Sequence, residues 1–283
     1  MPGESLDPAV RSTAPSLVLP TQLVEDVVRD YAAQREEQRL ATPWVVKLSP
    51  DALEASLYFE YQYRPRSRGA GAYSEQPEEV RQERSKANAA RRASGRLRRY
   101  AVANRLNRLG TLTYAVSCTD PWQVSKDVGR FFKDLRREVG RPFPYVWVRE
   151  WHPGGHGLHV HFLVGRFLRQ TLISEVWGRG IVDIRSRGPQ RLGDGPVAES
   201  RTAARYVAKY VSKAADEGRI PGLHRFEVAQ HFRPKEVILR ATNEPEALRQ
   251  ACRVMGGVPA THWRPNEERD GTGSIVAWMA WDR

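Results

Sequence analysis

Two histidines separated by one residue are the feature of the sequence most suited to chemistry. His159 and His161 stand in an apolar run that follows a Pro-Gly-Gly turn at residues 153–155. Alternate side chains of a β-strand point to the same face, so the two imidazoles would project together. The opposite face would carry Val160, Phe162 and Val164. Two imidazoles on one strand face form a natural pair of metal ligands.

A carboxylate that could complete such a site ends the preceding β-rich segment. The stretch from Glu150 to His159 is short enough to fold as a hairpin, which would place the carboxylate beside the histidine strand. Two imidazoles and one carboxylate with open positions suit Mn²⁺ or Mg²⁺ in phosphoryl transfer. Zinc is the less favoured alternative, although imidazole binds it well. A solvent-facing strand end is the other interpretation of Glu150, and His152 and His156 fit turn residues better than ligands.

A second candidate group lies on a helix expected over residues 199–217. With 3.6 residues per turn, Tyr210 lies about 40° around the helix from Tyr206. In the opposite direction from Tyr206, Lys213 lies at about 20° and Lys209 at about 60°. Small and apolar residues form the opposite face, namely Ala204, Val207, Val211 and Ala215. One face would therefore pack, and the other would offer two phenols and two ammonium groups.

This arrangement of tyrosines and lysines predicts that a phenol oxygen attacks the phosphorus atom of a phosphodiester. A free phenol has a pKa of about 10 and is a weak nucleophile at neutral pH. Lys209 and Lys213, about one turn away, would favour the phenolate and neutralise charge on a phosphate. The alternative is an amphipathic surface helix whose tyrosines cover a groove.

Charge and composition point to nucleic acid as the partner. The 283 residues carry a formal net charge of +12, and 40% of them are hydrophobic, enough for a sizeable core. No apolar run approaches the length of a membrane span, and the first residues lack the apolar region of a signal peptide. Cys118 and Cys252 lie far apart in the sequence, which argues against a disulfide framework and fits a reducing cytoplasm.

The most basic segment, residues 80–107, is expected to form a helix. So many positive side chains close together repel one another unless negative charge lies nearby. This favours contacts with a phosphate backbone over a face that is only solvated. The residues expected to bind DNA are Arg91, Arg92, Arg96, Arg98 and Arg99.

The segments that carry the candidate residues follow a recognisable order. Strands are expected near residues 111–118, 145–150, 158–164 and 180–185, with helices after Asp120 and near 168–176. The order β-α-β-β-α-β predicts an α+β fold with a ferredoxin-like, RRM-like antiparallel sheet and flanking helices. Strands are also expected at residues 56–63, 223–226, 237–239 and 274–281, the last as an edge strand or a protein contact.

With these residues placed, the chain resembles rolling-circle replication initiators of the HUH endonuclease superfamily. Residues 111–114 resemble the family's first, structural motif. Residues 159–164 resemble its His-hydrophobe-His motif, and residues 206–213 its two-tyrosine motif, as in bacteriophage gene A proteins. The resemblance covers about residues 109–213, and the second and third motifs together are its specific part. Initiators of actinobacterial plasmids are similar more loosely.

The resemblance implies an HUH endonuclease fold that nicks and rejoins single-stranded or hairpin origin DNA through a 5′-phosphotyrosine. It implies that His159, His161 and Glu150 hold the metal and that Tyr210, slightly favoured over Tyr206, attacks first. Host helicase and polymerase would be partners, with no membrane involved. A two-tyrosine transposase and a non-catalytic basic DNA-binding repressor remain alternatives.

The expected organisation has four parts. They are a disordered N-terminus at residues 1–20, a basic helical extension at 21–107, the endonuclease core at 108–245 and a C-terminal extension at 246–283. The oligomeric state and the origin sequence stay open.

Overall fold

The computed structural model describes most of the chain from residue 41 onward. The described residues are 41–60, 77–152, 154–186, 195–216, 220, 222–264 and 275–282, with isolated residues from 22 to 37. The chain divides into two units, residues 1–42 and 43–283, and every element named below lies in the second. The N-terminus expected to be disordered lies outside the described residues, as does most of the helix expected at 21–40. Among the described residues, no helix is long and apolar enough to cross a membrane.

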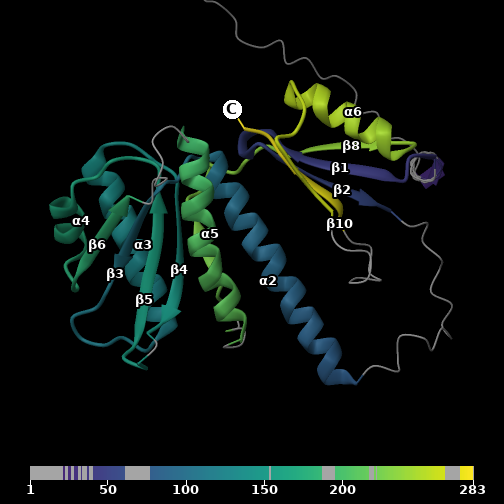
Figure 1. Ribbon diagram of the computed structural model, residues 1–283. Helices are drawn as coiled ribbons and strands as arrows, with labels where there is room; N and C mark the ends of the chain where they lie inside the picture. Colours follow the sequence, from purple (N-terminus) through teal and green to yellow (C-terminus); the bar gives the residue numbers. More distant parts are fainter. Residues whose placement is uncertain are drawn as a thin grey trace, which may run out of the picture. The chain divides into compact units, whose positions relative to one another are not determined.

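A five-stranded antiparallel sheet carries the candidate ligands (Figure 1). Its strand order is β6-β3-β5-β4-β7, with β3 at Arg108–Leu112, β4 at Tyr145–Trp151, β5 at Leu158–Val164, β6 at Val182–Ser186 and β7 at Phe226–Val228. Helix α3, Pro121–Val139, follows β3, and helix α4, Gln170–Trp177, follows β5. The elements from β3 to β6 therefore have the predicted β-α-β-β-α-β order, and the predicted α+β fold is confirmed. This sheet is called the core sheet below.

The two faces of the core sheet pack against different helices. Val160 and Phe162 of β5 lie in an apolar cluster with α3 and α4, whereas Leu163 lies in the cluster that contains α5, Gly195–Asp216. This alternation agrees with the sequence prediction. Helix α3 begins where expected, because the Asp120 side chain accepts a hydrogen bond from the backbone N–H two residues later, and it ends at Gly140 with a φ of 74°.

The first strand of the core sheet is displaced from its predicted position. The sequence predicts it over residues 111–118, but β3 ends at Leu112. Beyond that point the N–H groups of Thr113 and Ala115 donate to carbonyls of residues 181 and 179. Gly180, with a φ of 156°, lies where any Cβ would collide with this backbone. Residues 113–115 therefore run close to residues 179–181 but do not continue β3 as a regular strand.

A second antiparallel sheet combines strands from distant parts of the described chain. Its order is β8-β1-β2-β10-β9, with β1 at Trp44–Ser49, β2 at Glu54–Phe59, β8 at Val237–Ala241, β9 at Thr261–Trp263 and β10 at Ile275–Ala280. A 3₁₀ turn, Pro50–Ala52, joins the first two strands, and helix α6, Glu244–Met255, packs on β1 and β8. The edge position expected for residues 274–281 is wrong, because β10 pairs with β2 on one side and β9 on the other.

The long helix α2, Glu78–Ala103, packs along α5. Leu97 and Ala101 lie in the same apolar cluster as Val207 of α5, and the Ser94 hydroxyl donates to the carbonyl of Ala208 at 3.4 Å. Residues 81–87 are all exposed, so the C-terminal part of α2 provides the packing. The helix expected over residues 80–107 is therefore present and ends slightly earlier.

Gly110 in β3 provides a test of this packing. A Cβ at this position would collide with the ring of Phe162 and with the side chain of Ile184, which flank it on β5 and β6. Because Phe162 is fully buried, we expect Gly110→Ala to lower the free energy of unfolding by about 2–3 kcal/mol. Urea denaturation followed by circular dichroism measures the change.

Gly129 of α3 supplies the matched control. It is exposed, and a Cβ there would meet no atom within 4 Å. Gly129→Ala should raise the free energy of unfolding by roughly 0.5–1 kcal/mol, because alanine loses less backbone entropy in a helix. Equal effects of the two substitutions would contradict the packing described for β3.

Candidate functional site

The hairpin of β4 and β5 brings the candidate ligands together. Glu150 lies directly opposite His159, and Val148 lies opposite His161. Gly155 and Gly157 in the connecting turn have φ angles of 72° and 101°, which glycine adopts without strain. The short connection between Glu150 and His159 thus folds as the sequence predicts.

His161 lies at the centre of a chain of polar contacts. Its Nε2 is 2.8 Å from Oε2 of Glu150, and its Nδ1 is 3.1 Å from Oγ1 of Thr111. The ammonium of Lys213 donates to Oε1 of the same glutamate at 2.8 Å. The glutamate side chain is 13% exposed and that of His161 is 9% exposed. The carboxylate therefore lies between an imidazole and an ammonium group in a largely desolvated position.

Burial favours the neutral form of both histidines. Desolvation lowers the pKa of His161 below its usual value, although the hydrogen bond and charge of Glu150 oppose this shift. Desolvation also lowers the pKa of His159, with smaller contributions from His152 and His161, against the glutamate charge. A neutral imidazole keeps the lone pair that a cation requires, so both rings are chemically suited to bind one.

The tyrosines of α5 lie beside this group. The ring of Tyr210 stacks on that of His161, with 4.1 Å between centroids and 12° between planes. Tyr206 meets Tyr210 edge to face at 5.5 Å, and the ammonium of Lys209 lies 5.7 Å from the centre of the Tyr206 ring. The residues expected on the opposite side of the helix are buried, namely Ala204, Val207 and Val211. The side chain of Ala215 lies outside the described part.

The candidate ligands are held by contacts with one another and with their neighbours. Within the described part of the chain, no three or more His, Cys, Asp or Glu side chains are grouped closely enough to hold an ion. The ring of His159 lies 4.8 Å from that of His152, and both oxygens of Glu150 have protein partners. The chemistry of the donor set nevertheless fits a divalent cation, since it offers two neutral imidazoles and a carboxylate.

Three residues near the site have contacts that the sequence indicates only in part. His152 accepts a hydrogen bond from the Gly154 N–H through Nδ1, as a turn residue would, while its ring lies against His159. Exposed His156 accepts a bond from Ser117 through its carbonyl. Sequence reasoning missed the contact of Thr111 with His161, although an antiparallel register places the two residues opposite each other. A hydroxyl on the second ring nitrogen is the kind of contact that orients a histidine ligand.

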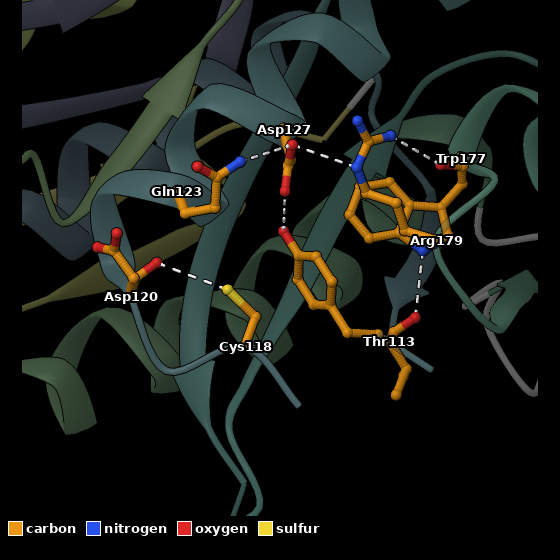
Figure 2. Close-up of polar contacts among 8 residues, drawn as sticks. Thr113, Cys118, Asp120, Gln123, Asp127, Trp177 and Arg179 are labelled. Atoms are coloured by element: carbon orange, nitrogen blue, oxygen red, sulfur yellow. Dashed lines mark hydrogen bonds and ion pairs between the residues drawn. The ribbon is translucent and has the colours of Figure 1, made fainter. Parts of the chain in front are cut away.

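A polar network steadies the segment that follows β3 (Figure 2). Asp127 of α3 accepts hydrogen bonds from Tyr114 and Gln123, both at 3.1 Å, and pairs with Arg179 at 3.2 Å. Burial, and then the negative charge of Asp127, raise the pKa of the Tyr114 phenol, so it remains a donor. The indole N–H of Trp177 donates to the carbonyl of Thr113.

This network also bears on the hairpin. The carbonyl of Cys118 accepts from the N–H of Leu158, and the hydroxyl of Ser117 donates to the turn.

We expect Asp127→Ala to lower the free energy of unfolding by about 2 kcal/mol, because Tyr114 and Arg179 lose their acceptor.

Gln123→Ala is the control for Asp127→Ala. The exposed side chain of Gln123 donates one bond to the same carboxylate, so its loss should cost well under half as much. Thermal melts of the two variants measure the difference, and equal costs would contradict a central role for Asp127.

The arginines predicted to bind DNA do not share one environment. Arg91, Arg92 and Arg96 are exposed along α2. Arg98 is partly buried, and its Nε has no hydrogen-bond partner among the described residues. Arg99 pairs with the largely buried Glu54 at 3.5 Å. The first three are therefore the most accessible to a polyanion.

One protein-family model matches the part of the chain that carries this group. The model of replication-associated proteins of the ORF2/G2P type matches residues 107–215. This segment runs from β3 to α5 and contains the candidate ligands, both tyrosines and both lysines. No curated protein matches the chain, and no solved structure does either. The match supports a replication initiator, and it covers less than half of the chain.

Proposed function

We propose that the protein initiates rolling-circle replication by nicking and rejoining single-stranded origin DNA. The observation that carries the proposal is the stack of Tyr210 on His161, within the segment that matches replication-associated proteins. A candidate nucleophile, ammonium groups and candidate metal ligands thus meet beside the core sheet of a basic chain. Acyl or glycosyl chemistry would not need paired tyrosines and lysines, whereas phosphoryl transfer to a phenol uses both.

The first step is attack by a phenol oxygen on the scissile phosphorus. The phenol of Tyr210 gives up its proton and its oxygen bonds to the 5′-phosphate, while the bond from phosphorus to the 3′-oxygen breaks. That oxygen takes up a proton and leaves as the 3′-hydroxyl. The phosphotyrosine keeps the energy of the phosphodiester, so attack by a 3′-hydroxyl reverses the step and rejoins DNA without ATP. Tyr206, edge to face with its neighbour, would serve the second cleavage.

His159, His161 and Glu150 are the residues that would hold Mn²⁺ or Mg²⁺, with Zn²⁺ less favoured. A bound cation supplies Lewis-acid polarisation of the phosphate oxygens. Lys209 lies beside Tyr206, where its positive charge would stabilise negative charge on a bound phosphate. Lys213 pairs with Glu150 and would balance the charge of a phosphate bound beside it.

Single-stranded or hairpin origin DNA is the proposed substrate, and the two-tyrosine HUH type is the proposed family. The sequence contains no Walker A loop. Host helicase and polymerase are the proposed partners that would separate and copy the strands. Exposed arginines of α2 would contact the phosphate backbone.

Covalent trapping tests this function. The protein is incubated with Mn²⁺ and single-stranded oligonucleotides that tile its replicon, and products are separated on a denaturing gel. We expect one origin strand to give a protein–DNA adduct together with a free 3′-hydroxyl fragment. The absence of an adduct on every strand, with binding to duplex DNA alone, would favour a non-catalytic repressor instead.

A further inference from the structure

A cleft with a volume of about 760 Å³ runs beside α2, and neither Tyr206 nor Tyr210 lines it. Its walls are α2, the segment that contains β7, the end of β1 and the approach to β8. This volume lies within the usual range of small-ligand pockets, roughly 300–1,000 Å³. A cleft of this size would admit a short segment of a single strand.

Cations outnumber acids around the cleft. Arg96, Arg99, Arg225 and Arg233 line it, together with Glu227 and Glu236. Arg99 is engaged by Glu54, which leaves the other three guanidinium groups as the main source of positive charge. Nη1 of Arg225 is buried and has no hydrogen-bond partner within the described residues. A buried donor without an acceptor is costly, and a phosphate oxygen is the acceptor that guanidinium matches best.

The walls of the cleft are held in place by hydrogen bonds. The hydroxyl of Tyr100 on α2 donates to the carbonyl of Ala229 at 3.2 Å, and Asn104 donates to the carbonyl of Phe232 at 3.0 Å. On the other side, Phe226 pairs with Val148 of β4. The segment from β7 to β8 is therefore fixed to both the helix and the core sheet, which reduces the entropy cost of binding a ligand.

The same elements lead from the cleft to the tyrosines. Helix α2 supplies Arg96 to the cleft, and α2 packs along α5, the helix that carries the two tyrosines. Strand β7 pairs with β4, and β4 ends with Glu150 and its neighbour. A strand of DNA bound at Tyr210 would therefore reach the arginines of the cleft by way of β4 and β7.

We propose that this cleft binds backbone phosphates of single-stranded DNA beyond the scissile phosphate. The choice of DNA as the source of phosphate rests on the proposed function. The ring of Tyr100 in the cleft is buried and its hydroxyl is engaged, and the charged groups that line the cleft include several guanidinium groups, so we expect backbone phosphates to make the main contacts. Binding through the cleft therefore contributes affinity that is independent of sequence and sensitive to salt.

Salt-dependent binding tests the inference. Tyr206→Phe with Tyr210→Phe keeps binding reversible, and fluorescence anisotropy with a labelled oligonucleotide gives the affinity at several salt concentrations. Adding Arg96→Ala with Arg233→Ala, both at exposed positions, should weaken binding uniformly across sequences. The slope of log affinity against log salt should become shallower by about 1.4, because single-stranded DNA contributes about 0.7 per phosphate contact.

Matched controls separate the cleft from net charge. Arg130→Ala with Arg141→Ala removes the same charge from exposed positions on α3 and just after it, and should leave the slope unchanged. Excess free nucleoside triphosphate should displace little DNA. Equal slopes for the two pairs of substitutions, in proteins with native circular dichroism, would overturn the cleft proposal, as would full displacement by the nucleotide.

The outcome also distinguishes this inference from the proposed function. If the slopes differ as expected but the unsubstituted protein forms no adduct, only the nicking function fails. If the adduct forms and the slopes are equal, only the cleft fails. If the protein binds no single-stranded DNA at all, both are overturned.

Discussion

Tyr210→Phe is expected to abolish formation of the protein–DNA adduct, whereas Tyr206→Phe retains the first cleavage. Phenylalanine keeps the ring that stacks on His161 at 4.1 Å and removes only the oxygen that would attack phosphorus. Loss of a nucleophile should lower the rate by on the order of 10⁴-fold or more. Single-turnover assays with a labelled origin oligonucleotide measure the rate of adduct formation for each variant.

The two tyrosines control for each other because they share a helix and touch edge to face at 5.5 Å. Tyr206→Phe should instead impair strand transfer, in which a second cleavage follows the first. An adduct that forms at the original rate with Tyr210→Phe would reassign the first attack to Tyr206. An adduct that persists in the double variant would place the nucleophile outside α5.

The second large effect concerns the candidate ligands. His161→Ala should remove measurable Mn²⁺ binding and lower the nicking rate by on the order of 10²-fold or more, because the ring that faces Glu150 at 2.8 Å is lost. Titration calorimetry with Mn²⁺ measures binding, and adduct assays measure the rate. A melt of the metal-free protein checks that the variant is folded.

His156→Ala is the control for this experiment. His156 lies in the turn between β4 and β5, its side chain is exposed, and its bond to Ser117 uses the backbone carbonyl. Its replacement should leave both Mn²⁺ affinity and rate unchanged. Unaltered Mn²⁺ affinity in His161→Ala would remove His161 from the set of candidate ligands.

Local rules are sufficient to predict much of the core sheet. The alternation of His159 and His161 with Val160 and Phe162 follows from strand geometry, and the structure places the apolar pair in the cluster with α3. The start of α3 is predictable because Asp120 followed by proline caps a helix. The split of α5 into a buried side and a tyrosine side follows from helical periodicity.

Long-range contacts cannot be predicted in the same way. The bond between Lys213 and Glu150 joins residues from two elements, and no spacing rule identifies it. The role of Asp127 is equally hidden, because a lone acid on an amphipathic helix carries no sequence signal for its partners on other segments. Strand β9 has three residues, too few for a periodic pattern, so nothing in the sequence indicates that β10 lies inside a sheet.

Mapping the covalent linkage tests the central claim most directly. The adduct formed by the unsubstituted protein with Mn²⁺ and the origin strand is digested with nuclease and protease, and peptide mass spectrometry locates the attached nucleotide. We expect a single 5′-nucleotide on the peptide of α5 that contains Tyr210, bound through the phenol oxygen. A nucleotide on a serine, on a histidine or on any tyrosine outside α5 would contradict the site described here.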